Sequence, residues 1–237
     1  MGKKLVLSIL AVGILAFGYA DYANAIPISV SATSDTFITK HSGLGGSSST
    51  HGSATDMWLI GIEDYRSFPL IRFDLTPFVG SVVNGSTATL QLDLIGSWGH
   101  NTGITQSVSV RQVLTDWTEG SSSFANFGGT GFNEASHTGA DLITKYVTFN
   151  GHTESILFTI PSSVVQGWID NAGTNYGLIM ISNTNAYRKD LVFASREGAA
   201  SPSLSFDATP VPVPATMLLF GSGLVCLVGT RLRRKKK

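Results

Sequence analysis

Leu90-Gln91-Leu92-Asp93-Leu94 alternates apolar and polar residues, and Ile71-Arg72-Phe73-Asp74-Leu75 repeats the pattern. Successive side chains of a β-strand point to opposite faces of the sheet, so this alternation buries one face and leaves the other in solvent. Related β-rich segments lie at 35–39, 57–60, 108–110, 147–149, 156–160, 176–181, 191–194 and 204–206. Together these segments predict about ten strands.

One short helix is expected among the strands. Pro161 suits a first helical turn, and Asn171-Ala172-Gly173 provides a stop signal. Apolar residues fall at helical spacing between them, at Val164, Val165, Trp168 and Ile169, so we interpret Trp168 as a core residue. Because no βαβ rhythm is present, the expected fold class is all-β, an antiparallel jelly-roll β-sandwich.

The N-terminal residues have the three parts of a secretory signal. Lys3 and Lys4 precede a short apolar run, and Ala23-Asn24-Ala25 provides a small-x-small end. A membrane anchor is the alternative, but the run is shorter than the ~20 residues of a spanning helix. We therefore predict a signal peptide at residues 1–25, export by the Sec machinery and cleavage after Ala25.

The C-terminal residues have a different three-part layout. Val211-Pro212-Val213-Pro214 precedes an apolar stretch over residues 215–230, and a basic cluster follows it. By the positive-inside rule the basic cluster stays in the cytoplasm, which puts the preceding domain on the outer side of the membrane. An ordinary C-terminal membrane helix is the alternative, although this stretch is short and contains three glycines.

This tail resembles the PEP-CTERM sorting signal of Gram-negative bacteria. The matching residues are the sorting motif Pro212-Val213-Pro214 and the apolar Leu218-Leu219-Phe220-Gly221. Val213 stands where the family has its namesake glutamate. The resemblance implies processing by an exosortase, a membrane cysteine transpeptidase, after transient anchoring by a membrane helix. It also implies delivery to the cell surface or extracellular matrix, with residues 210–237 as the sorting signal.

The intervening domain, residues 26–209, is acidic. It holds eight Lys and Arg against fifteen Asp and Glu, a net charge of −7. Nucleic acid is excluded as a partner, because its recognition requires a basic surface. The only cysteine, Cys226, lies in the tail, so the domain has no disulfide.

Nine short motifs occur in an order that resembles the DNRLRE domain, which is related to carbohydrate-binding module family 96. The motifs are Asp35-Thr36-Phe37-Ile38, Leu70-Ile71-Arg72-Phe73-Asp74-Leu75, Ala88-Thr89-Leu90-Gln91-Leu92, Val108-Ser109-Val110, Asp116-Trp117-Thr118-Glu119, Gln166-Gly167-Trp168, Asn175-Tyr176-Gly177-Leu178, Ser195-Arg196-Glu197 and Pro202-Ser203-Leu204. The resemblance spans roughly residues 30–207. It implies a jelly-roll sandwich with a non-catalytic role, often polysaccharide binding. Phe124 and Phe127 stand where the family often has a tryptophan.

Exposed aromatic rings beside polar groups are typical of sugar-binding sites. The best such cluster is Trp98-Gly99-His100-Asn101, in a glycine-containing loop that we expect to project the indole outward. Weaker clusters are Tyr187-Arg188-Lys189-Asp190 and Tyr65-Arg66. The alternative is that these rings pack against the rim of the sandwich.

Asp35 and Asp207 lie near the two ends of the domain and would form a calcium site if the terminal strands are neighbours. The alternative is two turn residues without a metal, and no other cofactor is expected. The five histidines show no metal-ligand spacing, and we expect them in solvated loops. No sequence motif pairs a second carboxylate with Glu119, and no serine-hydrolase motif is present, so the chain is not expected to be an enzyme.

These observations favour an exported, non-catalytic surface or matrix protein that binds extracellular polysaccharide. The competing interpretation is a structural biofilm or cell-surface protein without a specific ligand.

Overall fold

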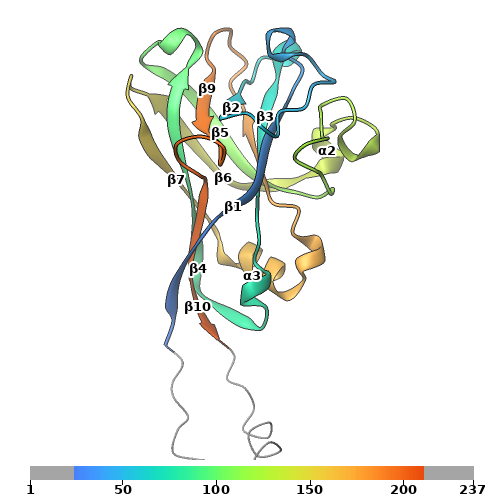
Figure 1. Cartoon of the computed structure of the whole chain (residues 1–237). Helices are drawn as coiled ribbons and strands as arrows, with labels where there is room; N and C mark the ends of the chain where they lie inside the picture. The colour runs from blue at the N-terminus through green and yellow to red at the C-terminus, as the bar shows by residue number, and fades with distance from the viewer. Residues whose placement is uncertain (1–23, 211–237) are drawn as a thin grey trace, which may run out of the picture. The chain divides into compact units, whose positions relative to one another are not determined.

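The computed structural model describes residues 24–210 and contains a strand-rich unit (Figure 1). Its strands are β1 Ile26–Thr39, β2 Asp56–Leu59, β3 Ser67–Phe73, β4 Ser81–Ser97, β5 Ile104–Val113, β6 Thr138–Phe149, β7 Glu154–Pro161, β8 Leu178–Ser182, β9 Leu191–Ala194 and β10 Ser203–Pro210. The helices described are α2 Glu134–His137 and α3 Ser162–Asp170, besides several single 3₁₀ turns. Every strand segment expected from the sequence overlaps one of these strands, so the all-β prediction is confirmed. The signal peptide and sorting segment lie outside the described residues, except for Asn24, Ala25 and Pro210.

Strand β1 takes part in two sheets. Its first residues pair with β10, from Ile26 opposite Ala208 to Ser31 opposite Ser203. From Ala32 onward it pairs with β3, and a bulge follows Ala32. One sheet therefore runs β2-β9-β4-β10-β1, with β7 also paired to β4, and the other runs β1-β3-β8-β5-β6.

The main hydrophobic core draws on both sheets. Leu90, Leu92 and Leu94 of β4 are at most 1% exposed, whereas Gln91 between them is exposed, as the alternating pattern predicts. The facing sheet contributes alternate residues of its own strands to the same cluster, among them Val108, Val110, Val147, Phe149, Leu178 and Met180. The period-two pattern therefore identifies the core face of each sheet correctly.

A second cluster covers the other face of the β3–β8 sheet. The connection between β5 and β6 folds over this face and brings Trp117 and Phe127 against Phe68 and Ile179. Phe132 joins them, with its ring 5.2 Å from that of Phe68 and 5.5 Å from that of Phe127. Burial on both faces explains why all residues of β8 are buried and why this strand lacks clean alternation.

Helix α3 lies beside β4 and closes one end of the core (Figure 1). Its buried residues are the four expected from the sequence, Val164, Val165, Trp168 and Ile169. The backbone N–H of Val83 donates to Gln166 Oε1 at 2.7 Å, and Gln166 Nε2 donates to Ser81 O at 3.2 Å, which joins the helix to β4.

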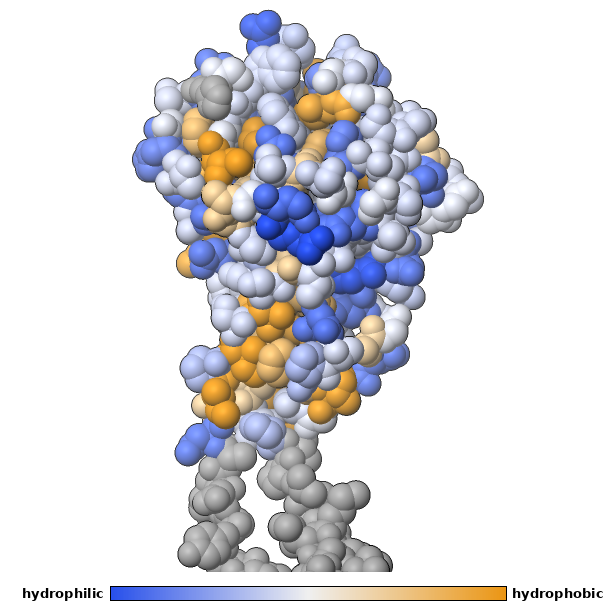
Figure 2. All heavy atoms as spheres, viewed as in Figure 1, coloured by the Kyte–Doolittle hydropathy of each residue, from blue (hydrophilic) through white to orange (hydrophobic). Residues whose placement is uncertain are grey.

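Figure 2 shows apolar side chains gathered over the end that holds α3, and mainly polar side chains elsewhere on this face. Exposed apolar residues near this end include Ile26 and Val82, at the starts of β1 and β4. Within residues 24–210 the helices are too short to cross a lipid bilayer. Ala25–Thr209 forms one compact unit, and both hydrophobic clusters lie within it. We therefore expect residues 26–210 to fold independently, and the experiments on the domain use this segment.

We predict that Trp168→Ala lowers the free energy of unfolding by about 3–5 kcal/mol, because the indole is 2% exposed and leaves a large cavity. Urea denaturation measures the loss. Tyr146→Ala is the control, because Tyr146 is 77% exposed and its removal should cost less than about 0.5 kcal/mol. A loss below about 1 kcal/mol for Trp168→Ala would contradict its place in the core.

Candidate functional site

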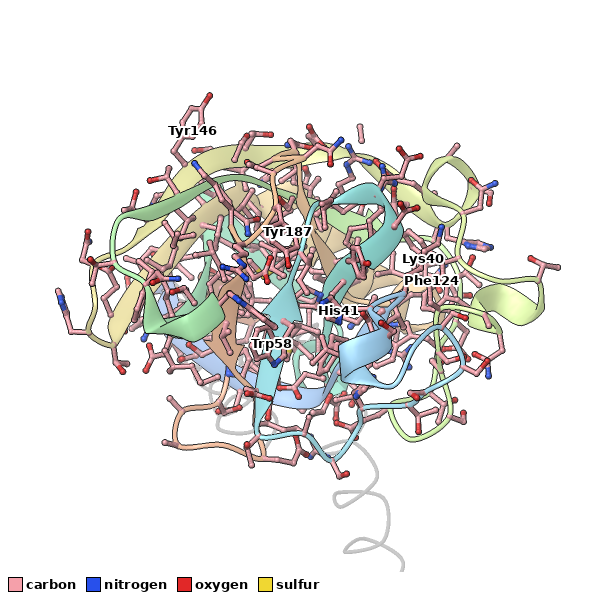
Figure 3. The ribbon with its side chains drawn as sticks, turned by 90° about the horizontal axis from the view of Figure 1, so that it is seen from above. Lys40, His41, Trp58, Phe124, Tyr146 and Tyr187 are labelled. Carbon is pink, nitrogen blue, oxygen red and sulfur yellow. The ribbon has the colours of Figure 1, made fainter. Side chains whose placement is uncertain are left out.

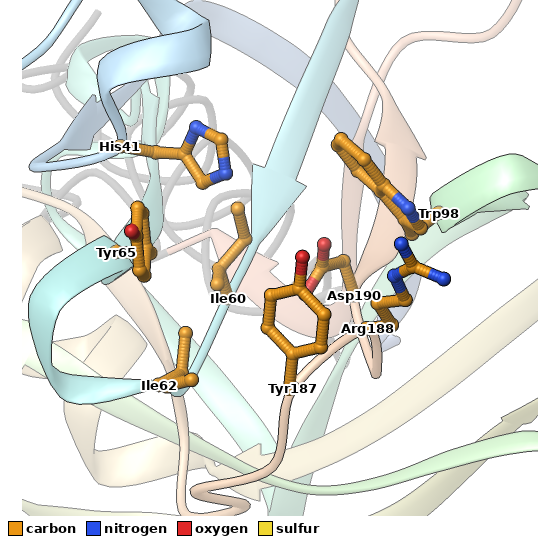
Figure 4. Close-up of a pocket in the computed structure, with 8 residues that line it drawn as sticks. All are labelled: His41, Ile60, Ile62, Tyr65, Trp98, Tyr187, Arg188 and Asp190. Atoms are coloured by element: carbon orange, nitrogen blue, oxygen red, sulfur yellow. The ribbon is translucent and has the colours of Figure 1, made fainter.

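A pocket of about 160 Å³ opens at one end of the domain (Figure 4). Four separate connections form it: the start of the β1–β2 loop, the β2–β3 loop, the turn after β4 and the β8–β9 loop. The lining residues are His41, Ile60, Ile62, Tyr65, Trp98, Tyr187, Arg188 and Asp190. The three aromatic clusters selected from the sequence, around Tyr65, Trp98 and Tyr187, therefore meet at a single site.

Aromatic rings form a continuous series along this pocket. The ring centroid of His41 lies 4.9 Å from that of Tyr65 and 6.1 Å from that of Trp98. Trp98 also contacts Trp58 of β2 edge-on, at 6.3 Å. Trp98 is half-buried, so the expectation of an outward-projecting, isolated indole is wrong. His41 and Trp58 come from other connections and provide the packing surface that the Trp98 loop itself lacks.

The turn after β4 fixes the position of Trp98. Gly99 adopts φ 63°, a left-handed conformation that favours glycine. Asn101 Nδ2 donates to the Trp98 carbonyl at 2.9 Å, and Ser97 Oγ donates to the Asn101 carbonyl at 2.6 Å. The Asn101 side chain therefore stabilises the turn, and Asn101 is not among the residues that line the pocket. The structure does not describe the side chain of His100.

The loop that carries Tyr187 is anchored to β5 at both ends. At its start, the Asn183 N–H donates to Ser107 O at 2.8 Å, and at its far end the buried Gln106 amide donates to Lys189 O. Between these anchors Tyr187 is 67% exposed, and the Arg188 guanidinium lies 5.2 Å from its ring centroid. Arg188 adopts φ 58°, an uncommon conformation for a non-glycine residue and one that concentrates at ligand sites.

Asp190 is the one carboxylate among the pocket-lining residues. It is 5% exposed, and burial raises its pKa to about 6. Among the described residues, no side chain or backbone N–H donates a hydrogen bond to this carboxylate. Because Asp190 lines the pocket, its carboxylate oxygens can accept hydrogen bonds from a ligand that brings hydroxyl groups.

The second predicted site, calcium between Asp35 and Asp207, does not form. Asp207 pairs with Pro27 near the start of β1, whereas Asp35 pairs with Ile71 after the bulge. Eight residues of extended strand separate Pro27 from Asp35, a span of roughly 26 Å. The terminal strands are neighbours, which was the condition for this site, but their antiparallel register places the two aspartates far apart.

Asp35 meets two other acids instead. One carboxylate oxygen each from Asp35, Glu119 and Glu197 lie within 4.8 Å of one another. Burial raises the pKa of Asp35, and the neighbouring Glu197 and Glu119 carboxylates raise it further. Arg196 pairs with both glutamates, at 2.9 Å and 2.8 Å. Sequence reasoning missed this grouping, although Glu119 and Glu197 both belong to the quoted DNRLRE-like motifs.

Three histidines have structural surroundings rather than the solvated loops that the sequence predicts. His41 contributes to the pocket wall. The His51 ring stacks on Phe37 at 4.0 Å, and its burial lowers the pKa. His137 is 8% exposed, and its Nδ1 accepts a hydrogen bond from the Asn133 N–H at 3.0 Å.

Comparison with known proteins adds one finding, at the C-terminus. Residues 210–235 match the model of the PEP-CTERM protein-sorting motif. This match supports an exported protein that is processed by an exosortase and transiently anchored at the membrane. It covers the expected sorting motif, including Pro212, Val213 and Pro214. A search of curated proteins found no match.

We predict that Asp190→Asn makes the folded state more stable at neutral pH, by roughly 1–3 kcal/mol, because each unit of pKa shift corresponds to about 1.36 kcal/mol. Well below pH 3.8 the wild-type Asp190 carboxyl is protonated in both the folded and the unfolded state, so the variant has no stability advantage. Between pH 3.8 and about 6 the unfolded state loses its proton first, and the wild type loses stability relative to the variant. Above pH 6 the difference stays constant.

Urea denaturation below, within and above this pH window measures the difference. Asp64→Asn is the control, because Asp64 is exposed in the turn before Tyr65 and makes no described hydrogen bond. Equal stability of wild type and Asp190→Asn at every pH would show that the Asp190 carboxylate is already satisfied in the folded protein.

Proposed function

We propose that the domain binds a neutral extracellular polysaccharide in the pocket formed by Tyr65, Trp98, Tyr187 and Asp190. The observation that carries the proposal is the convergence of aromatic rings from three separate connections around one buried carboxylate. Flat aromatic faces and a few fixed polar groups are the combination that recognises a sugar ring.

Each part of the pocket has a distinct task in this proposal. The exposed face of Tyr187 stacks on the apolar C–H face of a sugar ring, and Trp98 provides a second, half-buried surface. The Asp190 carboxylate accepts hydrogen bonds from neighbouring sugar hydroxyls, and Arg188 offers donors at the rim. A ligand that lacks hydroxyls at these points leaves Asp190 unpaired, so the site selects for their arrangement.

The domain is non-catalytic in this proposal. Glycoside hydrolysis requires two carboxyl groups about 5–10 Å apart across the bond, and Asp190 is the only carboxylate that lines the pocket. The net charge of −7 over residues 26–209 disfavours anionic glycans. Binding should therefore change little with salt, because few charges are paired with the ligand.

We also propose a family for the domain and a destination for the exported protein. Two sheets around one core, joined by antiparallel pairs, support a jelly-roll domain of the DNRLRE type. The sorting motif supports delivery to the cell surface or extracellular matrix of a Gram-negative bacterium. The alternative is a structural biofilm or surface protein without a specific ligand, in which the aromatic pocket only packs the loops together.

Tyr187→Ala tests the pocket most directly, because this ring is exposed and contributes little to folding. We predict roughly tenfold weaker binding to the recognised polysaccharide, equivalent to about 1.4 kcal/mol, with a nearly unchanged melting temperature. Affinity electrophoresis in gels that contain neutral polysaccharides measures binding, and thermal melts measure stability. Trp98→Ala should weaken binding as well, but with a lower melting temperature, because Trp98 packs against Trp58 and His41.

Tyr146→Ala is the matched control. Tyr146 is a somewhat more exposed tyrosine that projects from the periphery of the domain, whereas Tyr187, Trp58 and His41 lie near its centre when viewed from above (Figure 3). It should leave binding unchanged. Equal retardation of wild type and Tyr187→Ala would exclude the pocket as the binding site. No retardation of the wild type in any neutral polysaccharide would favour the structural alternative.

The processing of the two ends has its own test. We predict that the protein isolated from its native host starts at Ile26 and lacks the basic tail, because both terminal segments are removed during export and sorting. Intact-mass analysis of the surface fraction decides this. A surface species that retains residues 235–237 would contradict exosortase processing and indicate a permanent membrane anchor.

A further inference from the structure

Three carboxylates from distant parts of the chain meet beside the bulge of β1. Asp35 lies on β1, Glu119 in the connection after β5, and Glu197 in the turn after β9. Each contributes one oxygen to a group in which all three atoms lie within 4.8 Å of one another. Asp35 is 1% exposed, and both glutamate side chains are mostly buried.

Backbone and side-chain donors hold these carboxylates in place. The Arg196 N–H donates to Asp35 Oδ2 at 2.7 Å, and the Asp35 N–H donates to Glu119 Oε1 at 3.0 Å. The Arg196 guanidinium donates to both oxygens of Glu119, at 3.0 and 2.9 Å, and lies 2.8 Å from Glu197 Oε1. These contacts fix the positions of the acids before any ligand binds.

The donors leave two oxygens with little or no pairing. Asp35 Oδ1 is buried and accepts no hydrogen bond from an N–H or O–H donor among the described residues, and the Asp35 side chain instead meets the Glu197 carboxyl, which is also an acceptor when ionised. The described contact of Glu197 Oε2 is a long one of 3.4 Å, from the Ser195 hydroxyl. An unpaired buried carboxylate oxygen costs free energy, and it is an independent sign that the cluster accepts a ligand.

The charges of the cluster identify the class of ligand. Three carboxylates face a single guanidinium, which leaves two uncompensated negative charges for a divalent cation. A Ca²⁺ ion binds carboxylate oxygens at about 2.3–2.6 Å, so two ligand oxygens on opposite sides of it lie up to about 5 Å apart. The three oxygens all lie within 4.8 Å of one another, so a single Ca²⁺ can contact all of them. Mg²⁺ is less favoured, because it usually keeps several waters and binds only one or two carboxylates.

We propose that Asp35, Glu119 and Glu197 form a calcium site that joins β1, the β5–β6 connection and the turn after β9. Water molecules complete the coordination, as is common for Ca²⁺. The ion binds the folded state only, because the three ligands come together only through the tertiary fold. Calcium therefore stabilises the domain, and holds in place the connection that covers the second hydrophobic cluster.

A calcium titration of residues 26–210 by isothermal titration calorimetry, paired with thermal melts, tests the proposal. Extracellular calcium modules bind at about 10⁻⁴–10⁻³ M. At a hundredfold excess over the dissociation constant we expect the melting temperature to rise by about 5–10 °C, and to rise much less with Mg²⁺. The calorimeter should report one site per molecule.

Asp35→Asn is the decisive variant. It should abolish calcium binding and the rise in melting temperature that calcium causes in the wild type. If this variant does not fold, Glu197→Gln serves as the second test, and it should also lose the calcium response.

Asp207→Asn is the matched control. Asp207 is an exposed aspartate on β10, opposite Pro27 at the start of β1, so this variant should keep the full stabilisation by calcium. A wild-type protein that neither binds calcium nor gains stability from it would overturn the proposal and indicate that Asp35 and Glu197 share a proton instead. Retained calcium binding in Asp35→Asn, or its loss in Asp207→Asn, would also overturn it.

Discussion

The fold depends on the point at which β1 leaves one sheet and enters the other. Through Ser31 this strand pairs with β10, and from Ala32 it pairs with β3. The bulge just after Ala32 increases the local twist and lets one strand turn between two sheets that enclose a common core. Because β1 supplies hydrogen bonds to both sheets, its register fixes how their apolar faces meet.

The same arrangement of strands brings together the loops that form the pocket. The last residues of β1 lead directly to His41, and the ends of β2, β4 and β8 bring their connections to the same place. Loops on a sheet scaffold can vary in sequence without disturbing the core, which is why binding sites concentrate there. Here, hydrogen bonds from Gln106 and Asn101 restrict two of these loops, so the pocket is organised without a ligand.

Two buried carboxylates, Asp35 and Asp190, have raised pKa values. Burial raises the pKa of Asp35 and of Asp190, which means that each ionised form is less stable in the fold than in water. Asp190 lies in the proposed glycan pocket and Asp35 in the proposed calcium site, where a bound ligand would relieve that cost. Acids with shifted pKa values at such positions are characteristic of functional sites.

The sequence by itself determined the ten strand segments, the buried face of α3 and the sorting motif, because periodicity and short motifs are local properties of the chain. It also selected the aromatic residues of the pocket, but only as three separate clusters. The tertiary structure alone placed them around Asp190, packed Trp98 against Trp58, and gave Asp35 partners 84 and 162 positions away instead of Asp207. Such contacts follow from strand order and register, which depend on pairing between distant segments and leave no periodic signal in the sequence.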